Sequence, residues 1–447
     1  MTLVTDPNAH SSLDVVRDQV HARLRQADTF EGKGVWIRRC TPGEVEAQLA
    51  RLAGRMAQRL ELPLLGLTMA VKDNIDVAGL PTTAACPAFA YTPQVSAPVV
   101  QALCDAGAVV VGKTNLDQFA TGLVGTRSPH GACENFYDRR YVSGGSSSGS
   151  AVAVAAGLAD FALGTDTAGS GRVPAAFNNL YGIKPSCGLL STVGVVPACR
   201  SLDCVTVLAP TAALAQKVMR IAEGFDPNDI YSRSRQELTT AYATTLPRDI
   251  RVGVPDEDDL QFFGNAEYER LFAVACDRVT AIGARKTTID FGSFAETARL
   301  LYEGPWVAER LAAISEFYDR HADELLPVTR QIIGAAERIT AVDAFRGMYN
   351  LHALRRQARA EWDRMDVLLL PTAGTIYTIA DVDADPITTN RNLGYYTNFV
   401  NLLDLCALAI PAGFTGTGLP FGVTLVAPAG NEASLFAVAG RFAEGAS

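Results

Sequence analysis

The chain has 447 residues, of which 48% are hydrophobic and 19% charged, and its formal net charge is −9 at pH 7. This composition is typical of a globular protein and excludes an intrinsically disordered one. The negative charge argues against a nucleic-acid groove, because phosphate binding needs a positive surface. No stretch approaches the ~18 uninterrupted apolar residues of a membrane span. Residues 1–7 lack the basic and apolar pattern of a secretory signal.

Cysteine and histidine usage limits the chemistry that we expect. The nine cysteines are odd in number, irregularly spaced and without a CxxC pair, which predicts reduced thiols in a cytoplasmic protein. The five histidines form no HxH or HExxH pattern, so we expect no metal site. The base of an enzyme built on this chain therefore need not be histidine.

Hydrophobic periodicity predicts helices and strands that alternate along the chain. Thr41 and Glu44 have the pattern of a capping box, and a helix with apolar positions from Val45 to Leu60 follows. Further helices are expected at 98–106, 146–156 and 264–282, and through 291–365 with breaks at 304–305 and near Pro327. Apolar strands are expected at 65–71, 108–111, 161–164, 251–254, 285–289, 367–370, 407–410 and 423–426.

This alternation predicts an α/β fold in which helices cover both faces of a central sheet. The sequence contains no internal repeat and no long linker. A single α/β unit with a helical insertion at about residues 291–365 therefore fits better than the three domains that the length alone would allow.

Residues 107–114 match the GxxxxGK[ST] pattern of a phosphate-binding loop letter by letter. The middle of that segment is Ala-Val-Val-Val, whose β-branched side chains favour a strand over a loop. The segment also follows a predicted helix, whereas a phosphate loop must follow a strand. We therefore interpret it as a core strand and keep a P-loop NTPase as the alternative from another reaction class.

Two glycine- and serine-rich segments have the composition of a site built from backbone N–H groups. The first, residues 142–150, leads directly into the apolar run 151–156, whereas a flexible linker would have polar flanks. N–H groups in such a loop face a site, and the helix that follows favours an anion. The second, residues 163–172, takes a strand into a tight turn of small residues that ends at Ser170, as an oxyanion hole requires.

A serine nucleophile needs a base, and Lys72 is the candidate because it ends the predicted strand 65–71. A lysine in that position is commonly a surface charge whose stem alone is buried. A catalytic lysine must instead be buried deeply enough for its pKa to fall by several units. The residues alone leave both interpretations open.

Three segments together resemble the amidase signature family: residues 71–74, 144–150 and 164–172. The 24-residue step from Ser146 to Ser170 also matches that family. The resemblance runs from about residue 60 to the end and implies the family's mixed sheet without a metal or organic cofactor. It divides the chain into an N-terminal helical segment, 1–60, and an amidase signature domain, 61–447.

The resemblance also implies roles for individual residues. Ser170 is the acyl-accepting nucleophile, Ser146 is a bridging serine that follows a cis peptide bond, and Lys72 is the base that acts through Ser146. The oxyanion hole is formed by the N–H groups of Thr167, Ala168, Gly169 and Ser170. Arg172 matches a family position, and we expect it to support Asp166.

Within the family, residues 113–122, 301–310 and 394–401 resemble the allophanate hydrolases. That resemblance implies a homodimer and a functional link to a biotin-dependent urea carboxylase. Such hydrolases often carry a further C-terminal domain of more than a hundred residues. This chain ends at Ser447, in the expected last helix of the amidase domain, so we expect that the extra domain is absent or has been cut away.

Allophanate is a small urea-like amide that carries a carboxylate, which an arginine can bind with two parallel hydrogen bonds. By resemblance, a tyrosine and an arginine eight residues apart do this, and Tyr302 and Arg310 have that spacing. Gly122 is expected to lend a backbone contact to the substrate. The alternative is that Tyr302 packs in the core and Arg310 pairs with Glu303 or Glu309 on the surface.

Other activities within the family remain open: an aliphatic amidase, a biuret-type hydrolase, or the amidotransferase component that supplies ammonia to a misacylated tRNA. The negative charge and the Tyr302–Arg310 pair argue against the amidotransferase. A non-catalytic scaffold is a further alternative, which three intact catalytic positions disfavour.

Overall fold

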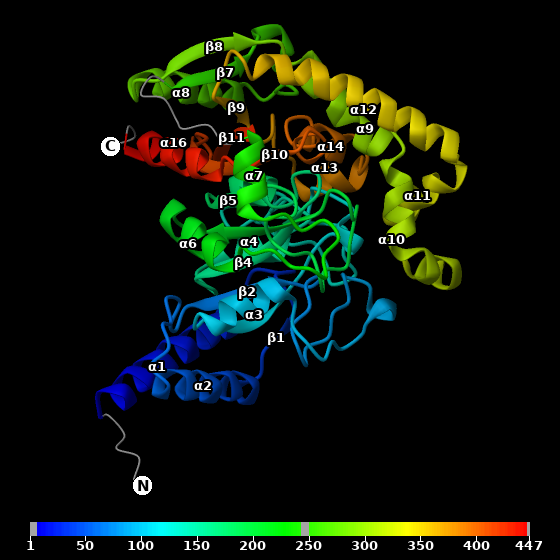
Figure 1. Cartoon of the computed structure of the whole chain (residues 1–447). Coiled ribbons are helices and arrows are strands. Elements are labelled where there is room, and N and C mark those ends of the chain that lie inside the picture. Colours follow the sequence, from blue (N-terminus) through cyan, green and yellow to red (C-terminus); the bar gives the residue numbers. More distant parts are fainter. Residues whose placement is uncertain (1–6, 243–249, 445–447) are drawn as a thin grey trace.

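The computed structural model describes residues 7–242 and 250–444. In this part of the chain eleven strands form one sheet, which runs through the whole molecule (Figure 1). From one edge to the other, the strands are β1 (Trp36–Arg39), β3 (Val109–Thr114), β2 (Thr68–Lys72), β4 (Phe161–Asp166), β6 (Cys204–Ala209), β5 (Tyr181–Lys184), β10 (Leu405–Phe414), β11 (Pro420–Pro428), β9 (Val367–Pro371), β7 (Arg251–Pro255) and β8 (Arg285–Ile289).

The helices lie between these strands along the chain. They are α1 (Pro7–Thr29), α2 (Pro42–Ala57), α3 (Pro98–Asp105), α4 (Ser148–Ala155), α5 (Arg172–Phe177), α6 (Ala212–Ala222), α7 (Arg235–Tyr242), α8 (Ala266–Ala281), α9 (Gly292–Glu303), α10 (Trp306–His321), α11 (Pro327–Gly334), α12 (Ala341–Glu361), α13 (Ile379–Ala384), α14 (Thr388–Leu393), α15 (Phe399–Leu402) and α16 (Glu432–Glu444). Short 3₁₀ turns are formed by Pro87–Phe89, Gln118–Ala120, Glu257–Asp259, Ala322–Glu324 and Ala335–Arg338.

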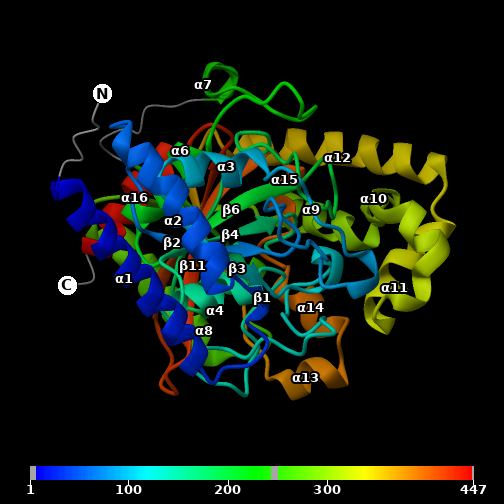
Figure 2. The ribbon, with the colours of Figure 1, turned by 90° about the horizontal axis from the view of Figure 1, so that it is seen from below.

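The sheet is mixed. Strand β2 pairs in parallel with β3 and β4, and β7 pairs in parallel with β8 and β9. The remaining neighbours, from β4 through β6, β5, β10 and β11 to β9, pair antiparallel, as does β1 with β3. Helices α4 and α5 cover one face, while α3, α6 and α16 line the other (Figures 1 and 2). The predicted α/β fold, with a mixed sheet covered on both faces, is confirmed.

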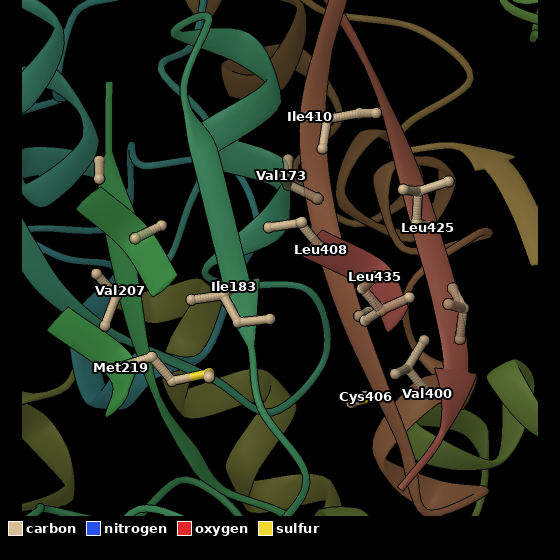
Figure 3. Close-up of a cluster of buried hydrophobic side chains, with 14 of the residues drawn as sticks. Val173, Ile183, Val207, Met219, Val400, Cys406, Leu408, Ile410, Leu425 and Leu435 are labelled. Carbon is tan, nitrogen blue, oxygen red and sulfur yellow. The ribbon is translucent and has the colours of Figure 1, made fainter. Parts of the chain in front are cut away.

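The centre of the sheet is held by a row of apolar side chains that crosses several strands. Directly paired residues share a face of the sheet. The pairs Val207↔Ile183, Ile183↔Leu408 and Leu408↔Leu425 therefore form one continuous row (Figure 3). Every member of this row is fully buried, and Met219 from α6 packs over it.

The segment that matches a phosphate-binding loop is a strand, as expected. Residues 109–114 form β3, and Lys113 pairs with Val71 of β2. The Lys113 ammonium is buried and lies 3.0 Å from the Asp73 carboxylate, so it is already neutralised within the core. This conformation excludes a phosphate cradle at that position.

Several element boundaries differ from the expectation. The strand expected at 65–71 begins only at Thr68, because Gly66 has a φ of 76° within a turn. Helix α4 starts at Ser148 rather than at Ser146, which leaves the first serines of that segment in a loop. The N-terminal segment, expected to be helical, also contains strand β1. Residues 1–6, used to argue against a secretory signal, and 445–447, at the end of the expected last helix, lie outside the described residues.

The expected insertion forms α9 to α12, with its breaks at Gly304–Pro305 and before Pro327. Both ribbon views place α10 and α11 beside the sheet rather than over its faces (Figures 1 and 2). Among the described residues, no helix is both long and apolar enough to cross a membrane.

Replacing Leu425 with alanine should lower the free energy of unfolding by about 2–5 kcal/mol, because a cavity opens in the buried row. Urea denaturation followed by circular dichroism measures this change. Val342→Ala is the matched control: Val342 is 57% exposed on α12, so its loss should cost no more than about 0.5 kcal/mol. Equal losses in the two variants would contradict the central position of the row.

Candidate active site

Lys72, at the end of β2, is completely buried, so the alternative of a surface charge is excluded. Its Nζ lies 2.7 Å from the Ser146 Oγ and 2.7 Å from the Thr165 Oγ1. Burial lowers the pKa of Lys72 to about 7, although three surrounding carboxylates act in the opposite direction. A substantial fraction of this amine is therefore neutral near pH 7, and a neutral amine can accept a proton.

The serine-rich loop brings Ser146 to this lysine. The peptide bond between Gly145 and Ser146 is cis. A side chain at Gly145 cannot fit, because a Cβ there would lie 2.1 Å from the Asp117 Oδ2. The next residue, Ser147, donates from its N–H to the Ser170 carbonyl at 3.1 Å and from its Oγ to the Thr165 carbonyl at 3.1 Å. The two glycine- and serine-rich segments are thus joined directly.

Ser170 lies in the turn between β4 and α5 and is almost fully buried. Its Oγ donates to the Gly122 carbonyl at 3.4 Å. Within the described residues no hydrogen bond joins the Ser170 Oγ to the Ser146 Oγ. The structure therefore brings Lys72 and Ser146 into contact and places Ser170 beside Gly122.

The Asp117 carboxylate folds the loop that carries Gly122. It accepts the N–H groups of Val124 at 3.2 Å, Gly125 at 3.0 Å and Arg127 at 2.9 Å. Because both oxygens are held by backbone donors, this buried carboxylate needs no side-chain cation as a partner.

An ion pair anchors the turn that ends in Ser170. The Arg172 guanidinium donates from Nε and Nη2 to the two oxygens of Asp166, each at 2.8 Å, and both side chains are fully buried. Burial raises the pKa of Asp166, but the charge and hydrogen bonds of Arg172 outweigh this effect and hold it below its usual value. The expected support of Asp166 by Arg172 is confirmed.

Backbone N–H groups cluster in the same turn. The Gly169 N–H donates to Asp166 at 2.7 Å and is therefore engaged, although it was among the predicted oxyanion donors. The Thr167 hydroxyl donates to the Asp203 carboxylate, which also accepts the N–H groups of Ala198 and Cys199. Burial raises the pKa of Asp203 to about 6. Asp203 immediately precedes β6, and this contact fixes the position of Thr167, the first predicted oxyanion residue.

Arg310 and Tyr302 lie next to each other, as the family resemblance implied. Arg310 is 2% exposed and donates from Nη2 to the Tyr302 hydroxyl and from Nη1 to the Thr121 Oγ1, both at 3.3 Å. Its Nε is buried without a partner. In the part of the chain that the structure describes, no carboxylate lies within ion-pair distance of Arg310. This buried cation therefore retains donors for an anion.

The alternative interpretation, in which Arg310 pairs with Glu309 on the surface, is wrong. The two carboxylate oxygens of Glu309 accept the Ser201 N–H at 2.7 Å and the Ser201 Oγ at 2.9 Å. Residues 196–203 thus connect helix α10 to the site, since Asp203 at their end holds Thr167. The segment also reaches the neighbourhood of Lys72, because Asn74 donates to the Val196 carbonyl at 3.2 Å.

Sequence reasoning missed Thr165, Asp117, Asp203 and Thr121. Thr165 lies inside the segment 163–172, so its proximity to Ser170 was a usable signal. The other three act through contacts that the sequence does not reveal. Among the described residues, no cluster of three or more His, Cys, Asp or Glu side chains could hold a metal ion.

The comparisons with known proteins identify the family to which this chain belongs. The chain belongs to the Amidase family, whose profile matches residues 18–436. The solved structure of Kluyveromyces lactis allophanate hydrolase superposes with a TM-score of 0.90 at 41% identity, covering 97% of this chain and 70% of that one.

Two curated relatives differ in how much of their length is matched. Urea amidolyase of Lachancea kluyveri is 46% identical over 403 residues, which are 89% of this chain but only 22% of that protein. A glutamyl-tRNA(Gln) amidotransferase component of Haloarcula marismortui is 32% identical over 83% of this chain and 93% of that protein. The chain thus spans about a fifth of the urea amidolyases that it matches.

Proposed function

We propose that this chain hydrolyses the terminal amide of allophanate to ammonia and N-carboxycarbamate, which then loses CO₂. The observation that carries the proposal is the buried Lys72 amine, 2.7 Å from the Ser146 hydroxyl in the loop that is hydrogen-bonded to Ser170. The similarity of this chain to Kluyveromyces lactis allophanate hydrolase, over 97% of its length, supports allophanate as the substrate.

In the proposed mechanism, neutral Lys72 takes the proton of Ser146 as Ser146 takes the proton of Ser170. For this transfer the Ser170 Oγ must turn from the Gly122 carbonyl toward Ser146. Ser170 then attacks the terminal amide carbon, ammonia leaves with a proton returned through Ser146, and water cleaves the acyl-enzyme. The oxyanion is stabilised by N–H groups of the 167–170 turn other than that of Gly169, which donates to Asp166. The loss of one such donor costs about 2.7–4 kcal/mol.

Arg310 and Tyr302 supply the proposed carboxylate subsite. The Arg310 guanidinium is buried, and within residues 7–242 and 250–444 it has only hydroxyl partners and an unpartnered Nε. A substrate carboxylate would provide the missing counter-charge, with two parallel hydrogen bonds. Thr121, which accepts from Arg310, precedes Gly122, so this subsite adjoins the carbonyl that contacts Ser170.

The wider context of the activity is also a proposal. We propose a cytoplasmic homodimer, on the basis of the family resemblance and of the nine unpaired cysteines. A functional link to a biotin-dependent urea carboxylase is supported by the matched relatives named urea amidolyase, which are much longer than this chain.

Ammonia release from allophanate by the purified chain tests the proposal. We expect rapid release by the wild type and at least a thousandfold loss, to order of magnitude, in Ser170→Ala, because the attacking oxygen is gone. Circular dichroism of the variant checks that the fold is intact. If the variant kept most of the activity, or if only neutral aliphatic amides were cleaved, the assignment would be wrong.

The pH profile tests the role of Lys72. Because the neutral amine is the base and burial lowers its pKa to about 7, kcat/KM should rise from pH 6 to pH 8 and then level off. Lys72→Ala should remove most of the activity at every pH. Asp203 has a pKa near 6, so Asp203→Asn is the control: the rise near pH 7 should persist in it. A profile that falls from pH 6 to pH 8 would refute the role.

If Arg310 binds the substrate carboxylate, its substitution should lower the activity on allophanate more than the activity on a neutral amide. Arg310→Ala should lower kcat/KM for allophanate by about 30-fold or more, since a buried charge pair is lost. For a neutral aliphatic amide the same variant should differ from wild type by less than about threefold. Arg320→Ala, at the exposed end of the same helix, is the matched control for both substrates. Equal losses on both substrates would show that Arg310 is structural.

A further inference from the structure

Two cysteine side chains touch where β5 ends and β6 begins. The Cys187 Sγ lies 3.4 Å from the Cys204 Sγ. The strands pair antiparallel through Ile183↔Val207, and continuing that register brings the residues after Lys184 opposite the start of β6. Cys187 lies in the turn three residues after the end of β5, and Cys204 is the first residue of β6. The two sulfur atoms are already in contact, so the approach that a disulfide requires is short.

Cys187 has the surroundings of a reactive thiol. It is partly exposed, and its Sγ lies 4.0 Å from the Lys184 ammonium. The hydrogen bond from the Cys204 thiol lowers the pKa of Cys187 to about 7, and the Lys184 charge adds to this effect against burial. Arg233, which donates to the Cys187 carbonyl, acts in the same direction, while Asp404 opposes it. The thiolate is the nucleophilic form of cysteine.

The remaining cysteines lack these features. Burial raises the pKa of Cys40, Cys104, Cys133 and Cys199 to about 12 and that of Cys276 to about 11. Burial also raises the pKa of Cys86 and of Cys406. Cys104 is also partly exposed, which makes it the natural comparison for Cys187. Oxidants should therefore select Cys187 among the nine cysteines.

Cys204 lies next to the machinery of the candidate site. It pairs with Asp166 across β6 and β4. The Asn401 Nδ2 donates to the Asp166 carbonyl at 2.8 Å and to the Leu202 carbonyl at 2.6 Å, which ties the two strands together. The residue between Leu202 and Cys204 is Asp203, whose carboxylate holds Thr167.

We propose that Cys187 and Cys204 form an oxidisable thiol pair, and that their disulfide slows the reaction at Ser170 by displacing Asp203 from Thr167. The second part rests on the proposed function, and the first does not. The oxidant is a peroxide. The Cys187 thiolate attacks one oxygen, the O–O bond breaks, and a sulfenic acid and hydroxide form; the hydroxide takes up the proton that the Cys187 thiol had released and becomes water. The Cys204 thiol then attacks the Cys187 sulfur, the S–O bond breaks, and a second water leaves.

Formation of the disulfide should disturb the site, because the two sulfur atoms must move closer together. They are 3.4 Å apart as thiols, whereas a disulfide bond is about 2.05 Å long. The backbone at Cys204 is held in the β4–β6 ladder, so movement there is passed to the adjacent Asp203. Displacements of about 1 Å at a catalytic centre can lower the rate by about a hundredfold.

Peptide mapping without reductant tests the pair. The reduced full-length chain is treated with hydrogen peroxide, its free thiols are blocked with N-ethylmaleimide, and the digest is analysed by mass spectrometry. We expect a peptide that links Cys187 to Cys204. The link should be missing in Cys187→Ser and present in Cys104→Ser, the control at the other partly exposed cysteine. If both Cys187 and Cys204 carried N-ethylmaleimide after peroxide treatment, the proposal would be overturned.

Two further measurements test the effect on the site. Ammonia release should fall at least about tenfold in the oxidised chain and return with dithiothreitol. Cys187→Ser should keep its basal activity and be insensitive to peroxide. Amide hydrogen exchange of residues 166–171 should rise on oxidation, a readout that needs no substrate. A linked chain with unchanged exchange and activity would overturn the coupling, whereas changed exchange in a chain inactive on allophanate would count only against the proposed function.

Discussion

Placing an amine deep in a protein without a counter-ion is the constraint on which this site depends. Lys72 is buried, and its hydrogen-bond partners among the described residues are the hydroxyl groups of Ser146 and Thr165. Lys113, on the adjacent strand, is also buried but lies 3.0 Å from the Asp73 carboxylate. Burial lowers the pKa of Lys113, whereas the Asp73 charge acts in the opposite direction and favours the charged amine. Lys72 and Lys113 are thus buried lysines in opposite situations, one paired with a carboxylate and one in contact with hydroxyl groups.

The carboxylates around Lys72 are kept from neutralising it by other partners. Asp166 is bound by Arg172 on both oxygens, and Asp117 is held by backbone N–H groups. Asp203 is bound to Thr167 and to two backbone N–H groups, and burial favours its neutral form. Each of these contacts also fixes a loop at the site. The same bonds that shape the backbone therefore also preserve the reactivity of the lysine.

The sequence was most informative where the signal was local. Strongly apolar runs such as 367–370 located strands, and breaks at proline and glycine located the joints of the insertion. Ser146, Ser170 and Lys72 could be singled out because the small residues around them form recognisable segments. Gly66, by contrast, delays the start of β2 through a positive φ that a run of apolar residues does not reveal.

Other parts of the site could not be predicted because they depend on contacts between distant residues. The support of Thr167 by Asp203 requires the pairing of β4 with β6, which brings together residues 36 positions apart. The burial of Lys72, and with it the pKa, depends on packing by α4 and the neighbouring strands. The engagement of the Gly169 N–H by Asp166 likewise depends on the detailed shape of the turn. Residue type and spacing carry no direct record of such geometry.

The hydrogen bonds from Ser201 to Glu309 join two parts of the chain that can change independently in evolution. The serines and the lysine are supplied by the sheet and its loops, whereas Tyr302 and Arg310 belong to the helical insertion. In the proposed function, bond cleavage and substrate choice are thus encoded in separate stretches of one gene. Substitutions in the insertion can change which substrate is bound without changing the serines and the lysine. This requires that residues 196–203 continue to hold the insertion in its position relative to the sheet.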